Sequence, residues 1–143
     1  MAAVTRVKAR PVSPPGYEVN DKGYIATAVI AGDLLIQDSA ATAPTGYEMV
    51  WVKAPAGAIE AQGIALMDVG AAGGTVGVGI HGEIDGFSGM TRGTPLYPSA
   101  TVAGGIDTTA TTSYSAATTP AVAVPAQPRV RALTASRIRY SFL

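Results

Sequence analysis

The sequence predicts a single, mainly β domain that is built from short strands and many turns. Its 143 residues provide one hydrophobic core and hardly enough chain for two. Hydrophobic residues make up 48% of the chain, but many of them are Ala and Val, and they are accompanied by 17 Gly and 10 Pro. This composition disfavours helices, and several segments alternate apolar and polar residues, as half-buried strands do.

The pattern along the chain divides it into an extended N-terminal arm over residues 1–23 and a β domain over residues 24–143. The arm is rich in proline and turn clusters and has little that could anchor a core, so we expect it to be poorly ordered in the free protein. The only helix expected is a short one around Ala54 to Gln62. Strands are predicted in the segments 24–32, 33–38, 47–54, 58–69, 76–85, 128–135 and 137–143.

The stretch GVGIHG at residues 77–82 has the spacing G-x-G-x-x-G of dinucleotide-binding loops. Such a loop needs a helix that opens directly after it, but glycines and prolines interrupt the next 16 residues from Glu83 to Pro98. The wider run from Val76 to Asp85 alternates instead, with Val76, Val78, Ile80 and Ile84 on one face. It therefore predicts a half-buried strand whose glycines serve a bulge, a bend or a close backbone approach.

The opposite face of that strand would carry His81, Glu83 and Asp85, which are residue types that bind metals or move protons. The chain has one His and no Cys, so a multi-histidine or thiolate centre cannot form within one copy. Polar side chains on the open face of an amphipathic strand are also what a half-solvated sheet requires. We expect no catalytic residues, no metal site, no cofactor and no enzymatic activity. The rival, a hydrolase or metal enzyme, predicts loss of a measurable activity in His81→Ala.

Charge is segregated along a chain whose formal net charge is zero. All ten acidic residues lie between Glu18 and Asp107, whereas seven of the ten bases lie near the two ends. They alternate with other residues, which places each set on one edge or face of an extended chain: Arg6, Lys8, Arg10, Arg129, Arg131, Arg137 and Arg139. Each pair alone is typical of a solvated strand face. Together, the basic ends indicate docking on an acidic partner or on a neighbouring copy.

Two classes of partner are not expected from the same composition. Nucleic acid is a poor fit, because the chain is neutral overall and its basic residues lack interleaved exposed aromatic residues. A membrane is also not expected, since no apolar run reaches 18 residues and the N-terminus has no continuous apolar segment of the secretory type.

One long stretch resembles a known family. The order V-G-I-H-G-E-I-D-G-F-S-G-M-T-R-G-T-P-L-Y-P-S-A-T-V-A-G-G-I-D-T-T, which begins at Val78, is similar to the core signature of phage capsid decoration (cement) proteins. The resemblance covers residues 57–109 well, and it extends more loosely to A-G-D-L-L at 31–35 and R-I-R-Y-S-F at 137–142. The chain departs from the family in its proline-rich arm and at 122–131, where V-A-V-P-A-Q-P-R-V-R replaces a G-x-A stretch.

This resemblance implies a small β-barrel or β-tulip domain that forms a homotrimer on the outer surface of an icosahedral head and clamps neighbouring major capsid proteins. The location implied is the exterior of the virion. The alternative is another phage structural module, such as a head fibre base or a tail component. The expected capsid contacts are Arg6, Lys8, Arg10, Pro14 and Pro15 on the arm, and the expected capsid or subunit contacts on the last strands are Arg129, Arg131, Arg137 and Arg139.

Overall fold

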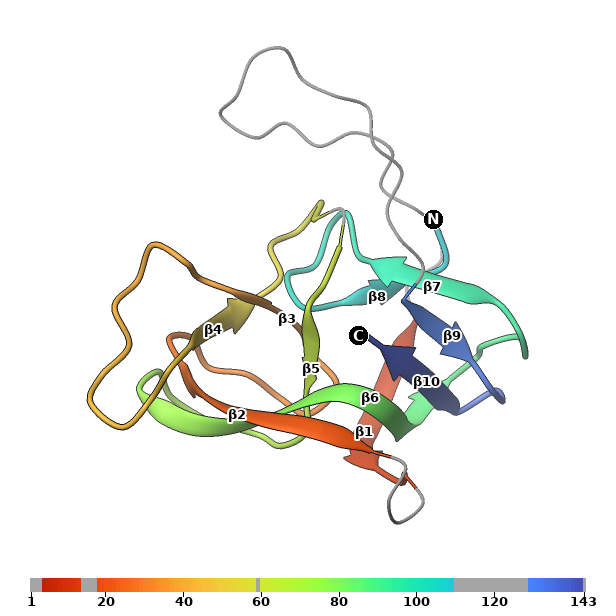
Figure 1. Ribbon diagram of the computed structural model, residues 1–143. Coiled ribbons are helices and arrows are strands. Elements are labelled where there is room, and N and C mark those ends of the chain that lie inside the picture. Colours follow the sequence, from red (N-terminus) through yellow and green to blue (C-terminus); the bar gives the residue numbers. More distant parts are fainter. Residues whose placement is uncertain (1–3, 14–17, 59, 110–128, 143) are drawn as a thin grey trace.

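The computed structural model describes residues 4–13, 18–58, 60–109 and 129–142. Within these ranges the chain forms ten strands and no helix, which confirms the predicted β class (Figure 1). The strands are β1 (Thr5–Pro11), β2 (Val19–Ile25), β3 (Leu34–Gln37), β4 (Val50–Lys53), β5 (Gly63–Ala65), β6 (Gly74–Ser88), β7 (Pro95–Pro98), β8 (Ile106–Asp107), β9 (Val130–Ala132) and β10 (Arg137–Ser141).

Five of the strands close into a small barrel in the order β2-β4-β3-β5-β6. The ring is complete because the first half of β6 pairs with β5 on one side and with β2 on the other. Closure leaves no free backbone edge around this part of the molecule. Its hydrophobic core surrounds the fully buried Trp51 and consists of seven buried residues: Ile25, Val29, Leu35, Trp51, Ala65, Val76 and Val78. The predicted small β-barrel is therefore confirmed.

The second half of β6 leaves the barrel and becomes the centre of a curled sheet. It pairs with β1 on one edge and with β10 on the other, and the sheet continues from β10 through β9 and β7 to β8. The sheet curls back on itself, because the Val4 amide at the start of β1 donates a hydrogen bond to the Ile106 carbonyl of β8 (3.0 Å). We call the line where β1 meets β8 the β1/β8 seam. The core here includes Leu96, Ile138 and Tyr140.

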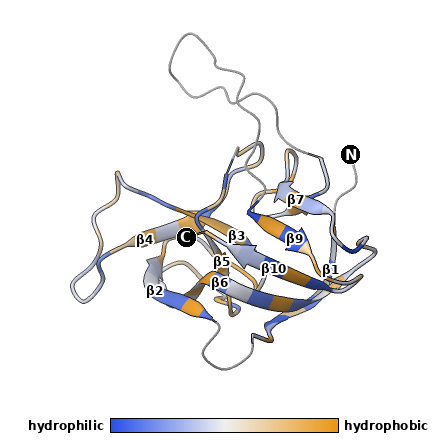
Figure 2. Ribbon diagram, turned by 45° about the vertical axis from the view of Figure 1, so that its right-hand side comes forward, coloured by the Kyte–Doolittle hydropathy of each residue, from blue (hydrophilic) through white to orange (hydrophobic). Residues whose placement is uncertain are grey.

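The glycines of the GVGIHG stretch allow a ring to lie against the backbone of β6. A Cβ atom at Gly79 would collide with the Tyr140 phenol, and one at Gly82 would lie 2.8 Å from the Tyr140 Oη atom. The apolar face that was predicted for this strand points into the cores, with Val76, Val78 and Ile84 fully buried, and the alternation along β6 is visible in Figure 2. The interpretation of GVGIHG as a strand with a close backbone approach is confirmed.

Gly86 bends β6 at the point where it pairs with β1. Its φ angle of 102° lies in the left-handed region, and a Cβ atom there would collide with the Lys8 carbonyl. The register shifts at this bulge, since Arg10 lies opposite Asp85 whereas Arg6 lies opposite Phe87. Directly opposed residues share a face, so the bulge turns Arg6 towards the core side and leaves Arg10 on the outer side.

The expected division at residue 23 needs correction. It falls inside β2, and residues 5–11 and 19–25 both pair with β6, so β1 and β2 belong to the folded sheets rather than to a separate arm. Ala9 is buried in the core against Gly32. The sequence suggested an arm because these strands expose most of their side chains and are held largely through backbone pairing with β6. Pro14 and Pro15 lie outside the described residues.

The short helix expected around Ala54 to Gln62 is also wrong for the described part of that segment. Pro55 and Gly57 form a turn there, in which the Ala58 amide donates to the Pro55 carbonyl (3.0 Å) and Gly57 has a φ angle of 82°. The Gly57 amide donates to the Ser99 carbonyl (2.9 Å). Tertiary hydrogen bonding and a glycine in the left-handed region therefore override the weak helical tendency of the alanines.

Candidate interaction surfaces

The basic C-terminal strand β10 folds onto the acidic strand β6. Arg139 lies opposite Glu83 in the strand register, and its Nη2 atom is 3.4 Å from Glu83 Oε2. Arg137 approaches the other carboxylate oxygen of Glu83 at 3.9 Å. Both arginines remain 40% or more exposed, whereas the Glu83 side chain is 11% exposed. The expectation that Glu83 lies on a solvated face is therefore wrong, because two arginines cover its carboxylate.

Asp85 lies between the two basic ends of the chain. Arg10 of β1 and Arg137 of β10 are its partners in the strand register on either side. The pKa of Asp85 is lowered, chiefly by the backbone N–H of Gly86, with smaller contributions from the Ser136 hydroxyl and the two arginines and an opposing one from partial burial. This carboxylate therefore stays ionised at neutral pH.

The outer face of β1, β6, β10 and β9 carries an excess of positive charge. Arg131 of β9 lies opposite Arg139, and it is exposed. Lys8 and Arg10 flank Asp85 around a hollow of about 360 Å³. We call this set of five cationic and two anionic side chains the basic face: Lys8, Arg10, Arg131, Arg137, Arg139, Glu83 and Asp85. Five of the seven basic residues predicted as contacts, from both ends of the chain, are thus brought onto one surface together with Asp85 and Glu83.

Two of the predicted contact residues lie elsewhere. Arg129 forms an exposed ion pair with Glu60 at 3.9 Å. Arg6 does not continue the line of Lys8 and Arg10, because the bulge turns it inward, where its Nη1 atom donates to Asp33 Oδ1 (2.7 Å). The prediction that Arg6, Lys8 and Arg10 share one face is therefore wrong for Arg6.

Asp33 is the centre of a buried charged cluster. Its carboxylate is 5% exposed, and beyond Arg6 it accepts a hydrogen bond from the Ile30 amide (2.9 Å) and lies 3.8 Å from Lys53 Nζ. Arg6 also donates to the Gly32 carbonyl (3.2 Å), and its guanidinium lies 5.9 Å from the centre of the Phe87 ring. The cluster ties β1 to the turn before β3 and to the end of β4.

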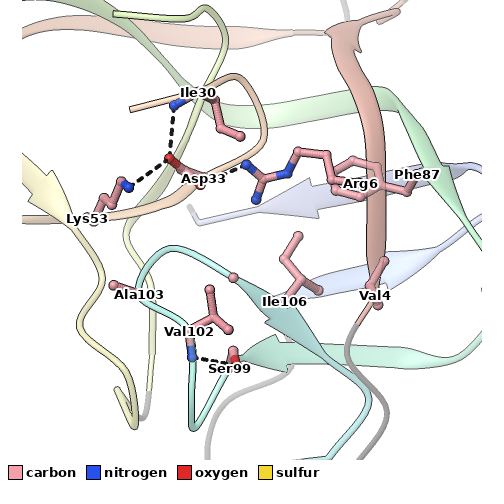
Figure 3. A pocket seen from close by; sticks show the side chains of 11 residues that line it. Val4, Arg6, Ile30, Asp33, Lys53, Phe87, Ser99, Val102, Ala103 and Ile106 are labelled. Carbon is pink, nitrogen blue, oxygen red and sulfur yellow. Dashed lines mark hydrogen bonds and ion pairs between the residues drawn. The ribbon is translucent and has the colours of Figure 1, made fainter. Parts of the chain in front are cut away.

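A pocket of about 350 Å³ opens beside this cluster at the β1/β8 seam (Figure 3). Its apolar lining comes from Val4, Ile30, Phe87, Val102, Ala103 and Ile106. Ile30 and Val102 are 52% and 55% exposed, which makes them the two most exposed of the large hydrophobic side chains noted in the described ranges. The pocket therefore combines an apolar rim with a charged floor.

The pocket residues other than Arg6 were missed from the sequence. Asp33 lies between Gly32, which has a φ angle of 92°, and two buried leucines. An acidic residue directly before an apolar pair was the sequence signal that could have pointed to a buried charge at the edge of the core. No local sequence pattern identified Arg6 as the partner of Asp33, since the two residues are 27 positions apart. Exposed Ile30 and Val102 lie in loops, where single apolar residues are common.

His81, Glu83 and Asp85 share the strand β6, as predicted. Both Glu83 oxygens face arginines. Among the described residues, no group of three His, Cys, Asp or Glu side chains is arranged to hold a metal ion. No helix that could cross a membrane is found in the same ranges.

Comparisons with models of protein families, with curated proteins and with solved structures found no match to this chain.

Proposed function

We propose that this chain is a capsid decoration protein that binds the outside of an icosahedral phage head and stabilises contacts between neighbouring major capsid proteins. The observation that carries the proposal is the resemblance of residues 57–109 to the core signature of that family. These residues form β5, the long strand β6 and the β7–β8 hairpin, which together join the barrel to the curled sheet. The signature thus coincides with the structural centre of the molecule rather than with a peripheral loop.

The chemistry of the surface supports a docking role. Arg137 and Arg139 of the basic face are held in position by the carboxylate of Glu83. Both side chains remain partly exposed and can therefore contact an acidic surface of a partner. Such rim charges mainly tune the rate and the salt dependence of association. The exposed Ile30 and Val102 at the pocket supply apolar area that charges alone would not provide. We further propose that the protein acts as a homotrimer on the shell.

The experiment is a binding assay with heads of the parent phage that lack this chain. Purified protein is mixed with expanded and with unexpanded heads, the heads are sedimented, and bound protein is quantified. Saturable binding to expanded heads, with density at many equivalent shell positions in cryo-electron microscopy, supports a decoration protein. Binding at one vertex supports the alternative of a head fibre base or tail component. No binding to either form of the head contradicts the proposal.

The contribution of the basic face is tested in the same assay with two matched variants. Lys8→Gln with Arg10→Gln removes two charges from this face, and Lys22→Gln with Arg92→Gln removes two exposed charges outside it. Because exposed pairs contribute roughly 0 to 1 kcal/mol each, the first variant should bind several-fold more weakly at low salt and with a shallower salt dependence. Equal salt dependence for both variants would show that the basic face does not contact the shell.

The oligomeric state has its own measurement. Light scattering at micromolar concentration gives the mass of the free protein, and the cryo-electron microscopy map gives the number of copies that meet at each shell position. Three copies around each position are expected. A single isolated copy both in solution and on the shell would contradict the homotrimer.

A further inference from the structure

The pocket at the β1/β8 seam carries an inference that deepens the proposed function and rests on it. We infer that this pocket receives an extended segment of the major capsid protein that presents an apolar side chain next to a carboxylate. The apolar side chain enters between Ile30 and Val102, and the carboxylate pairs with Lys53. Three properties of the pocket support this inference: its size and lining, its charge, and the rigidity of its walls.

Size and lining favour a side chain rather than a cofactor. The volume of about 350 Å³ lies near the lower end of the roughly 300–1,000 Å³ that ligand pockets span. The deep wall is formed by Phe87 and Ile106, each 3% exposed, while Ile30 and Val102 stand at the mouth and are more than half exposed (Figure 3). An inserted apolar group would cover this rim and contact the buried wall, which is the arrangement of an interface anchor.

The charge of the pocket selects an acidic partner. Arg6 and Lys53 supply two positive charges and Asp33 one negative charge, so the floor is cationic. The Asp33 carboxylate is already engaged by Arg6, by the Ile30 amide and by Lys53, and it has little capacity left for a ligand. Lys53 is 37% exposed and lies 3.8 Å from Asp33, a long contact, so its ammonium group can donate to an incoming carboxylate.

The walls of the pocket are fixed before any partner arrives. Ser99 is buried, and its hydroxyl accepts hydrogen bonds from the Thr101 and Val102 amides (3.2 and 3.1 Å). Gly104 donates its amide to the Ala54 carbonyl (2.8 Å), and its carbonyl accepts from the Leu34 amide (2.9 Å). The loop that carries Val102 is therefore tied to β3 and to the end of β4, and little conformational freedom remains to be lost on binding.

The first experiment uses the sedimentation assay with two pairs of exposed hydrophobic residues. Ile30→Ser with Val102→Ser removes the rim of the pocket. Val19→Ser with Met67→Ser removes the same number of large side chains of similar exposure, 45% and 49%, outside the pocket lining. We expect at least about a tenfold loss of head affinity for the rim variant and less than about a twofold change for the control. Thermal unfolding of both variants checks that they remain folded.

Lysine variants test the charge in the same way. Lys53→Gln should weaken binding several-fold, whereas Lys22→Gln, which changes an exposed lysine of β2 outside the pocket, should leave it unchanged. If wild-type protein binds heads and the rim and Lys53 variants bind equally well, the pocket inference is overturned while the decoration function stands. If wild-type protein does not bind heads at all, the proposed function fails.

A second experiment judges the pocket without heads. The ¹⁵N-labelled protein is titrated at millimolar concentration with N-acetyl-Leu-Asp-amide and with N-acetyl-Leu-Asn-amide, while NMR follows the backbone amides. We expect saturable shifts confined to Lys53, Ala103, Gly105 and their neighbours, several-fold stronger for the aspartyl peptide, and abolished in the rim variant. The absence of saturable shifts, or shifts outside the pocket, would overturn the inference. Equal binding of both peptides would overturn its acidic part.

Discussion

The barrel and the curled sheet share the strand β6, yet they are built in different ways. The barrel closes through backbone pairing around its whole circumference, and its core around Trp51 holds no charged side chain among the described residues. The curled sheet meets itself at the β1/β8 seam, where a hydrogen bond joins Val4 to Ile106. The buried polar residues of the described ranges lie in this second half or at its junction with the barrel: Asp33, Glu83, Ser99 and Asp107.

This difference separates stability from recognition. Apart from the Trp51 Nε1 atom, the barrel core is made of apolar groups, so it stabilises the fold without offering charged groups for binding. Buried charges cost free energy unless they are paired, and two of the buried carboxylates have arginine partners. Asp33 pairs with Arg6 at the junction of the two halves, and Glu83 pairs with Arg139 within the curled sheet. The cations of the basic face and the apolar rim of the pocket both lie on the curled sheet or at its junction with the barrel. We therefore expect changes in the barrel to act on folding and changes near the seam to act mainly on binding.

The largest effect is predicted for Trp51→Ala. This substitution empties the centre of the barrel, where the side chain is fully buried, and large-to-small changes of this kind cost about 3–5 kcal/mol. Because β6 runs through both halves, the whole chain should unfold in one transition, at a lower urea concentration than the wild type. Met67→Ala, at an exposed position, should change stability by less than about 0.5 kcal/mol. If the free energy of unfolding of Trp51→Ala fell by less than about 1 kcal/mol, the central role of the barrel would be contradicted.

A smaller loss of stability is predicted for Gly86→Ala, which disturbs the pairing of β1 with β6. The φ angle of 102° disfavours alanine, and the new Cβ atom would collide with the Lys8 carbonyl. We expect the free energy of unfolding to fall by at least about 2 kcal/mol, with faster hydrogen exchange in β1 than in the barrel. Gly89→Ala is the matched control, since its φ angle is 77° and nothing lies within 4 Å of the added atom. Equal losses in both variants would show that backbone strain alone, and not the packing of β1, matters here.

Arg6→Gln tests the buried pair with Asp33. The carboxylate keeps the Ile30 amide and Lys53, so the loss should be limited to about 1–3 kcal/mol. Urea unfolding measures it, and the double variant Arg6→Gln with Asp33→Asn should recover part of the loss because no buried carboxylate is left with reduced pairing. Additive losses in the double variant would mean that the two side chains do not stabilise one another.

The smallest effect at neutral pH is predicted for Tyr140→Phe. Burial, aided by the charge of Glu18 and opposed by the Ser13 hydroxyl, raises the pKa of Tyr140 to about 12. Since the folded state holds this proton more tightly than the unfolded state, the resulting stability is complete below about pH 10 and is lost as pH rises towards about 12. Urea unfolding between about pH 8 and about pH 11.5 should show a steeper alkaline loss in the wild type than in Tyr140→Phe. Parallel curves would contradict the raised pKa.

Local sequence patterns correctly predicted those parts of the fold that depend on neighbouring residues, such as the strand β6. The alternation from Val76 to Asp85 identified β6 and its buried face, because the side-chain direction in a strand depends only on its period of two. The arm was misjudged, since β1 and β2 gain their order from pairing with residues of β6 that lie 49 to 83 positions further along the chain. Such long-range pairing leaves no local trace in residues 5–25.

The charges of the site were recognised, but their partners were not. Segregated basic and acidic residues indicated attraction to another molecule, whereas the fold uses much of that attraction itself, as in the pair of Arg139 and Glu83, which are 56 positions apart. The bulge at Gly86 turned Arg6 away from the face that carries Arg10, because a step of four positions on β1 lies opposite a step of only two on β6 between these pairs. The pocket depends on five separate segments of the chain and could not be predicted from any one of them.

The most direct test of the account is a cryo-electron microscopy map of expanded heads decorated with the wild-type chain. We predict density at many equivalent positions, with the β1/β8 seam against the shell and a capsid segment between Ile30 and Val102. Density at a single vertex, no added density, or a seam that faces away from the shell would contradict it.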